Sequence, residues 1–112
     1  MPKKITRHIA LVRFLTTAPP KQFAALLKIL TPDQINALAE ISHNTISRDI
    51  GLSKTNKRRL RKYTDFLVHL ASHHKSISSK KSLLRRSVKA LSVLLKVMLP
   101  AIETLMASVA TR

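Results

Sequence analysis

The sequence predicts an all-α protein, a small bundle of four to five helices with a long, proline-kinked C-terminal helix. Three observations lead to this prediction. The 112 residues include a single glycine, Gly51, so the Gly and Asn-Gly turns that β-hairpins need are missing. Leu, Ala, Lys, Arg and Ile dominate the composition instead. Hydrophobic residues make up 45% of the chain, too many for a disordered basic tail, and they recur at helical spacing.

Two helices are predicted over residues 3–17 and 20–30. Pro19 and Pro20 separate them, because the residue before a proline is driven out of the α region. Pro20 also suits the first turn of the second helix, where no intrahelical partner is lost. The apolar positions expected to face the core are Ile5, Ile9, Val12, Leu15, Phe23, Leu26, Leu27 and Leu30.

A third helix is predicted over residues 32–49, where several start signals coincide. Thr31 is a candidate N-cap, Pro32 suits the first helical position, and Gln34 completes a capping box. Gly51 fits the left-handed residue that follows a helix. The positions expected to be buried are Ile35, Leu38, Ala39, Ser42 and Ile46.

A fourth helix, over residues 54–73 with Ser53 as its N-cap, carries the densest charge in the chain. Its expected core positions are Leu60, Tyr63, Phe66, Leu67 and Leu70. The stretch 53–62 holds six cations and no acid: Lys54, Lys57, Arg58, Arg59, Arg61 and Lys62. Such a density of like charge costs self-repulsion, which favours a polyanionic partner. The alternative is a solvated cationic face.

A polar, serine-rich stretch then precedes the most apolar part of the chain. We predict a linker at 75–82 between a helical basic domain at 1–74 and an apolar helix at 83–112, all packed as one domain. Ser78 or Ser79 is expected to cap this last helix, and Pro100 to kink or split it near Leu99. Spacings of four and three define a seam that packs in the core or on another copy: Leu84, Val88, Leu91, Leu95, Met98, Ile102, Leu105 and Val109.

The net charge of +16 and the pI near 11.5 point to nucleic acid as partner, with an anionic membrane surface second. Double-stranded DNA is the expected ligand, bound through its phosphates without base readout. The candidate contacts are the six cations of 53–62 together with Lys75, Lys80, Lys81, Arg85 and Arg86. The same cations also resemble a nuclear localisation signal.

Two other functions remain open. A helix-turn-helix over 43–62 would read a DNA sequence, but the fit is partial, because Lys57 stands where an apolar docking residue is needed and position 47 is serine. A membrane-active C-terminal helix is the second, since lysines and arginines flank its apolar body.

The remaining residue types argue against enzymes, cofactors and metals. Five acids are spread along the chain, with no paired carboxylates, no glycine-rich phosphate loop and no cysteine. His69 and His73 have helical spacing and His74 adjoins them, yet Asp65 is the only nearby carboxylate, so exposed histidines are expected rather than a metal site. Arg13 interrupts the N-terminal apolar run, so no secretory signal is predicted and an intracellular location is expected.

Residues 52–84 resemble a small basic protein of Maverick/Polinton-type elements and adintoviruses. That family has the pattern LSxxxKRKLRRYKxxLxxLxxKxxSxxxKKxLL before a proline-containing, leucine-rich tail, and the likeness extends over about residues 20–105. The matching positions are Leu52, Ser53, Lys57, Arg58, Leu60, Arg61, Tyr63, Leu67, Leu70, Ser78, Lys80, Lys81, Leu83 and Leu84, with Leu99-Pro100-Ala101-Ile102 in the tail.

The resemblance implies a virion-associated DNA-binding protein, similar to minor core components of adenovirus type and located in the virion and the host nucleus. This chain lacks the family's glycines before the tail and a Gly-Gly-type protease site. Cleavage during maturation is therefore not implied.

Overall fold

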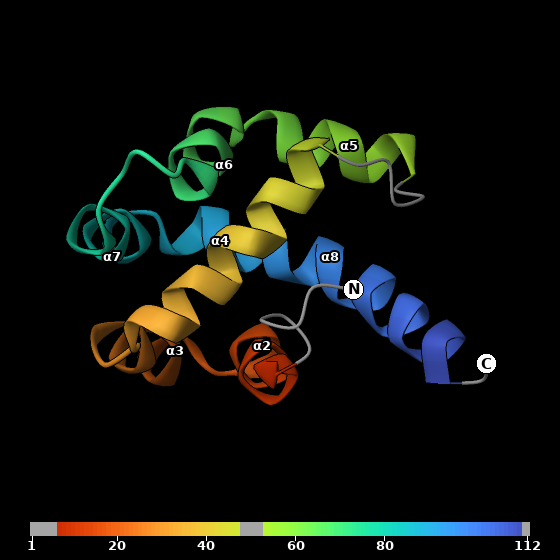
Figure 1. Cartoon of the computed structure of the whole chain (residues 1–112), viewed down its shortest axis with the longest axis horizontal. Helices are drawn as coiled ribbons and strands as arrows, with labels where there is room; N and C mark the ends of the chain where they lie inside the picture. The colour runs from red at the N-terminus through yellow and green to blue at the C-terminus, as the bar shows by residue number, and fades with distance from the viewer. Residues whose placement is uncertain (1–6, 48–52, 111–112) are drawn as a thin grey trace.

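Helices make up the regular structure of the described residues. The computed structural model describes residues 7–47 and 53–110, with side chains for 7–46 and 53–104. Within these residues there are seven helices and no strand: α2 (Ile9–Thr17), α3 (Pro20–Lys28), α4 (Pro32–Ser47), α5 (Lys54–Arg61), α6 (Thr64–Ala71), α7 (Ile77–Arg86) and α8 (Val88–Ala110) (Figure 1). The all-α prediction is confirmed, whereas the predicted count of four to five helices is wrong.

The helix predicted over 54–73 is broken between α5 and α6. Tyr63 has φ −113° and ψ 23°, and its N–H donates to the Leu60 carbonyl at 2.9 Å, three residues back instead of four. The Thr64 hydroxyl donates to the Arg61 carbonyl at 2.8 Å and satisfies an acceptor at the helix end. The chain therefore turns at Lys62 and Tyr63 although no glycine or proline marks the position.

The polar stretch predicted as a linker forms the start of a helix. The Ser76 hydroxyl accepts the Ser79 N–H at 3.0 Å, and α7 runs from Ile77 to Arg86. Residues 77–82 are thus helical, and the cap is Ser76, not Ser78 or Ser79. A second break at Ser87, with φ −124° and ψ 46°, separates α7 from α8.

Pro100 lies inside α8 and does not split it. The helix runs from Val88 to Ala110, and the Thr104 hydroxyl donates to the Pro100 carbonyl at 2.9 Å. A proline removes one backbone donor but leaves its carbonyl available, so a long helix can continue through it. Of the two alternatives predicted for Pro100, a kink or a split near Leu99, the split is therefore wrong.

Local start signals correctly predicted where α3, α4 and α5 begin. The Thr31 N–H donates to Gln34 Oε1 at 2.9 Å, and the Gln34 N–H donates to Thr31 Oγ1 at 3.2 Å, which completes the capping box of α4. Ser53 Oγ accepts the Asn56 N–H at 3.1 Å and caps α5. The predicted role of Gly51 and the first residues of the 3–17 helix lie outside the described residues.

The helices are arranged around the crossing of α4 and α8. In Figure 1, α4 runs diagonally across α8, with α2 and α3 on one side and α5 and α6 on the other. The main contacts are α4 with α6, α2 with α8, α3 with α7, and α5 with α8. The radius of gyration is 13.3 Å, which matches the value of about 13 Å expected for a compact domain of this length.

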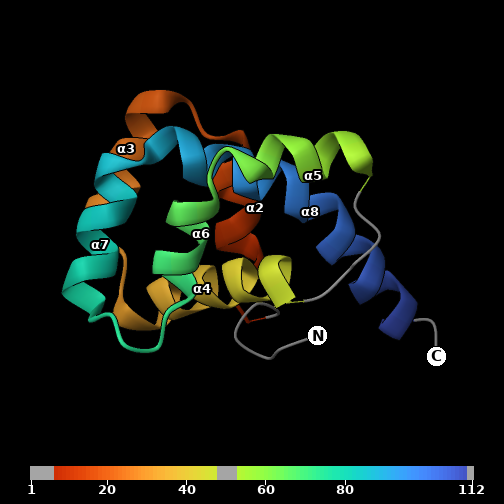
Figure 2. The same cartoon turned by 90° about the horizontal axis from the view of Figure 1, so that it is seen from above.

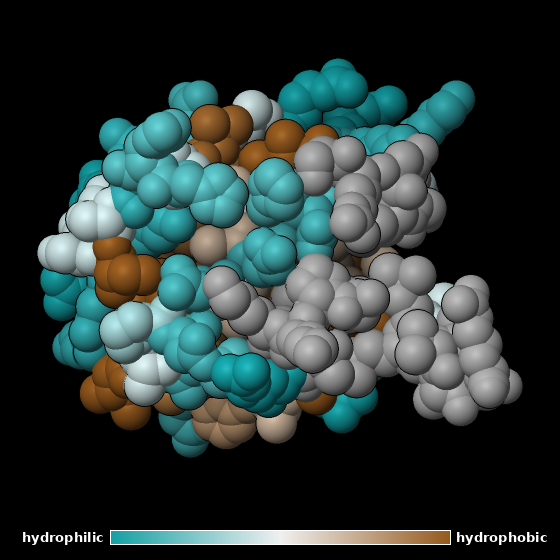
Figure 3. Space-filling model, in the orientation of Figure 1, coloured by the Kyte–Doolittle hydropathy of each residue, from teal (hydrophilic) through white to brown (hydrophobic). Residues whose placement is uncertain are grey.

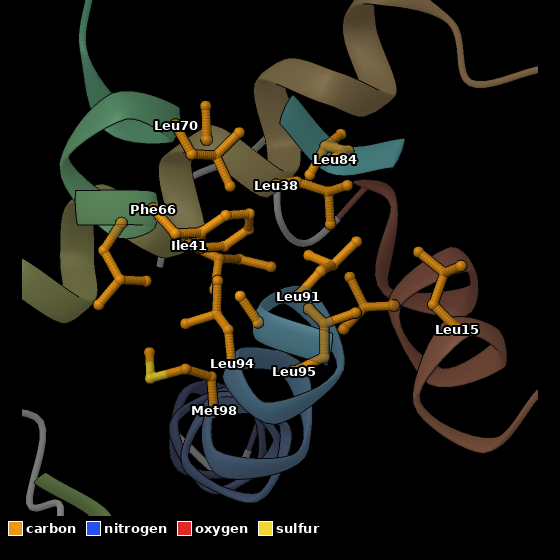
Figure 4. Packing of buried hydrophobic residues seen from close by; sticks show 14 of the residues in the cluster. Leu15, Leu38, Ile41, Phe66, Leu70, Leu84, Leu91, Leu94, Leu95 and Met98 are labelled. Atoms are coloured by element: carbon orange, nitrogen blue, oxygen red, sulfur yellow. The ribbon is translucent and has the colours of Figure 1, made fainter. Parts of the chain in front are cut away.

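The core draws apolar residues from every described helix. In Figure 4, Leu91, Leu94, Leu95 and Met98 of α8 face side chains of α4 and α6, and Leu15 of α2 closes one side. One expected core residue, Ile46 in the last turn of α4, is 50% exposed. Three others are half-buried against the core: Ile9, Leu26 and Tyr63.

The seam of the C-terminal segment faces this core. Its described members Leu84, Leu91, Leu95, Met98 and Ile102 are 0–1% exposed within the single chain, and Val88 is half-buried. The side chains of Leu105 and Val109 lie outside the described ones. The five buried positions are thus occupied by contacts within the chain. None of the described helices carries an apolar stretch long enough to span a lipid bilayer.

Candidate nucleic-acid interface

The cations of α5 lie on the outside of the molecule. Leu60 is the one residue of α5 that is buried, and it faces the core. The six cations of 53–62 are all exposed: Lys54, Lys57, Arg58, Arg59, Arg61 and Lys62. Figure 3 shows hydrophilic side chains gathered over α5 at the top of the view.

Helical geometry arranges most of these cations on one side. A helix turns about 100° per residue, so Lys54, Arg58 and Arg61, spaced by four and three, form one row. Lys57 and Lys62 flank this row, whereas Arg59 lies on the other side of the helix. We call Lys54, Lys57, Arg58, Arg61 and Lys62 the α5 row. Their spacing along one exposed face suits a phosphate backbone.

Three arginines of this stretch also stabilise α5 itself. Arg58, Arg59 and Arg61 lie in the last turn of α5, where the negative end of the helix dipole stabilises cations. Lys54, in the first turn, has no such benefit and is disfavoured by the same dipole. The helix end thus accounts for part of the charge but not for the whole row.

Acids do little to offset the charge. Asp33 Oδ2 lies 3.2 Å from an Arg7 guanidinium nitrogen and 3.3 Å from His8 Nε2, while Glu103 Oε1 lies 2.8 Å from Arg13 Nε. These pairs join cations of the N-terminal helix region. Between residues 54 and 89 the sequence has one acid, Asp65, against twelve lysines and arginines.

The second group of candidate contacts, around α7, is only partly exposed. Lys75, Arg85 and Arg86 are exposed, and Lys81 is half-buried. Lys80 is 5% exposed and is therefore not part of the surface. It shares the core-facing side of α7 with the buried Leu83 and Leu84, three and four residues further on.

The two basic groups are connected through α8. The helix α7 leads through Ser87 into α8, and α5 packs against α8. In Figure 2, α7, the start of α8 and α5 follow one another from left to right. Lys89, exposed near the start of α8, adds a cation three residues after Arg86.

The packing of α5 differs from that of a helix-turn-helix. In that motif the second helix docks on the first, so that its outer side enters the major groove. Here α4 packs mainly against α6, and α5 packs against α8. The connecting residues 48–52 lie outside the described ones.

The histidines near the end of α6 point in different directions. His69 Nε2 lies 3.0 Å from Ser79 Oγ in α7, whereas the His73 ring lies 6.1 Å from the His43 ring of α4 between centroids. The helical spacing of His69 and His73 is lost because α6 ends at Ala71. Among the residues that the structure describes, no group of three or more His, Cys, Asp or Glu is placed to hold a metal ion.

Burial and charge act together on His69. Burial lowers the pKa of its imidazole, and the nearby cations Lys75, Arg86 and Lys80 lower it further. The sequence analysis missed this cluster, because Ser79 contacts His69 across a break that the residue pattern does not predict. Burial and these cations thus both disfavour the charged form of the His69 imidazole.

Comparison with known proteins does not assign the chain to a family: no family model, no curated protein and no solved structure matches it.

Proposed function

We propose that this protein binds double-stranded DNA through its phosphates, without reading the sequence, and compacts it as a minor core component of a DNA virus or virus-like element. The observation that carries the proposal is the α5 row, a line of exposed cations on one helix face. The viral context comes from the resemblance of residues 52–84 to the basic protein of Maverick/Polinton-type elements and adintoviruses. The same resemblance implies a location in the virion and the host nucleus.

Counterion release supplies the driving force. Each lysine or arginine that neutralises a phosphate frees condensed counterions, so affinity falls with salt by a slope of about −0.9 per phosphate on duplex DNA. The longest extent of the molecule is 38 Å, close to one turn of B-DNA at roughly 34–36 Å. A single molecule therefore has room to contact phosphates along about one helical turn.

Compaction follows from the charge that remains. The whole chain carries a net charge of +16, more than the α5 row contributes. Cations outside the row, such as Arg85, Arg86 and Lys89, are available to a second duplex segment when the α5 row is occupied. Neutralised segments then approach each other more closely.

A salt titration with a matched control tests the proposal. The test variant is Arg58→Gln with Arg61→Gln in the α5 row, and the control is Lys21→Gln with Lys28→Gln, two exposed lysines of α3. Both variants lose two positive charges. We expect the test variant to reduce the salt slope by about 1.8 and the control to reduce it little. Anisotropy of two labelled duplexes of unrelated sequence measures affinity and sequence preference together.

Equal losses in both variants would refute the α5 row as the contact surface. A strong preference for one of the duplexes would refute phosphate binding without readout, in favour of a sequence-specific regulator. The membrane-active alternative requires Leu91, Leu95 and Met98 to leave the core, since all three are 0–1% exposed.

A further inference from the structure

Two histidines from different parts of the chain lie together where α4 meets the end of α6. The imidazole of His43, on α4, and that of His73, two residues after the end of α6, have ring centroids 6.1 Å apart and ring planes tilted by 56°. Both side chains are exposed. Neither belongs to the α5 row, so this pair is available for a function other than DNA binding.

The packing of α4 on α6 determines where the two rings lie. These helices pack against each other more extensively than any other pair of described helices. The buried Ser42, which precedes His43, donates its hydroxyl hydrogen to the Leu67 carbonyl of α6 at 2.7 Å. The Ser72 N–H donates to a carbonyl of the last turn of α6 at 3.2 Å, which fixes where the chain leaves that helix toward His73. The fold therefore brings together two rings that are far apart in sequence.

The distance between the rings suits a single metal ion bound by both. A Zn²⁺ ion binds an imidazole nitrogen at about 2.0–2.1 Å, and that nitrogen lies about 1.1 Å from its ring centre, so two rings on one ion have centroids between about 5 Å (tetrahedral) and about 6.3 Å (linear) apart. The observed 6.1 Å lies within this range. Each ring needs only one nitrogen for the ion, because metal-binding histidines generally use the other nitrogen for a hydrogen bond.

We propose that His43 and His73 bind a divalent, late first-row transition ion such as Zn²⁺, which ties the turn after α6 to α4. No third His, Cys, Asp or Glu joins them within the described part of the chain, so water fills the remaining coordination positions. Imidazole favours Zn²⁺, Cu²⁺ and Ni²⁺, whereas Mg²⁺ and Ca²⁺ favour oxygen ligands. The inference goes beyond the proposed DNA binding and does not depend on it.

The positive charge of the protein weakens the binding of a cation and gives it a distinctive salt dependence. The chain carries a net charge of +16, and Lys75, exposed and two residues after His73, is the nearest cation in sequence. Salt at about 0.15 M screens charges that are more than about 8 Å apart. The affinity for Zn²⁺ should therefore rise with salt up to this concentration, whereas the affinity for DNA falls.

Urea unfolding of the full chain, without a polyhistidine tag, tests the site. Only the folded chain brings the two rings together, so a bound ion stabilises the fold: at ten times its dissociation constant it raises the folding equilibrium constant about elevenfold. We expect Zn²⁺ to raise the urea midpoint, EDTA to reverse the rise, and Mg²⁺ to have no effect. The variant His43→Gln should abolish the rise, and the control His74→Gln, which removes another exposed histidine, should keep it.

Proton NMR of the histidine rings identifies the ligands. The ring signals of His43 and His73 should shift with Zn²⁺, and those of His8 and His69 should not. A wild-type midpoint that Zn²⁺ leaves unchanged would overturn the site, as would an equal rise in His43→Gln. Loss of the rise in His74→Gln would give His74 the place of His73 and would overturn the assignment of the pair.

Discussion

The substitution Leu91→Ala tests whether the seam of α8 stabilises the single chain. Leu91 is 0% exposed and lies in the core between α8 and α4 (Figure 4). The change removes three carbon atoms, worth about 2.4 kcal/mol at about 0.8 kcal/mol each. The cavity left behind brings the expected loss to about 3–4 kcal/mol. A domain of this size has a stability of roughly 6–17 kcal/mol, so the variant should fold with a much lower unfolding midpoint.

Urea denaturation followed by helical circular dichroism measures this loss. The matched control is Lys96→Ala, an exposed position on the same helix, where the change should stay within about 0.5 kcal/mol. Both variants are measured at two protein concentrations. A loss below about 1 kcal/mol, or a midpoint that rises with concentration, would show that the seam works between copies and would refute the intramolecular core.

Three further changes probe other parts of the structure. Ser42→Ala removes the buried hydrogen bond from Ser42 Oγ to the Leu67 carbonyl (2.7 Å) and should lower the unfolding free energy by about 1 kcal/mol in urea, and an unchanged midpoint would contradict that contact. Pro100→Ala restores a helical donor within α8 and should raise the free energy of unfolding by up to about 3 kcal/mol, which a higher thermal midpoint would show. A lower midpoint would show that the proline's shape is needed. The pKa of the Asp33 carboxyl is lowered, most of all by its hydrogen bond to His8. The ionised carboxylate therefore stabilises the folded protein above the pKa that Asp33 has in the unfolded chain, and this stabilisation is lost as the pH falls through its pKa in the folded protein. Asp33→Asn should therefore reduce the stability difference between neutral and strongly acidic pH, and an identical pH profile would refute it.

Features that depend on neighbours in sequence could be predicted from the sequence. The capping box of Thr31 and Gln34 and the Ser53 cap need only residues three positions apart, so local chemistry decides them. The buried seam positions of α8, Leu91 to Ile102, could be placed in the same way, because their spacing follows from helix geometry. Their continuity with Leu84 could not, since the break at Ser87 puts Leu84 in α7. The exposure of the cations in 53–62 follows from the opposite face of α5 carrying Leu60.

Features set by packing could not be predicted. The apolar period continues from Leu60 through Tyr63 to Leu67, so the pattern gives no sign of the break between α5 and α6. Lys80 belongs to a run of cations in sequence, and only the docking of α7 shows that its side chain is buried. The contact of His69 with Ser79 spans ten residues and two helices, beyond the reach of any periodic pattern.

The attachment of α5 by a single buried residue has a consequence for its motion. This helix has eight residues and buries only Leu60, whereas α8 places a series of leucines in the core. Its amide hydrogens should therefore exchange with solvent through local opening, and those of α8 through unfolding of the whole domain. A polyanion that binds the closed helix shifts this local equilibrium toward it. The protection of α5 amides in hydrogen exchange would then report, residue by residue, how fully the basic surface is occupied.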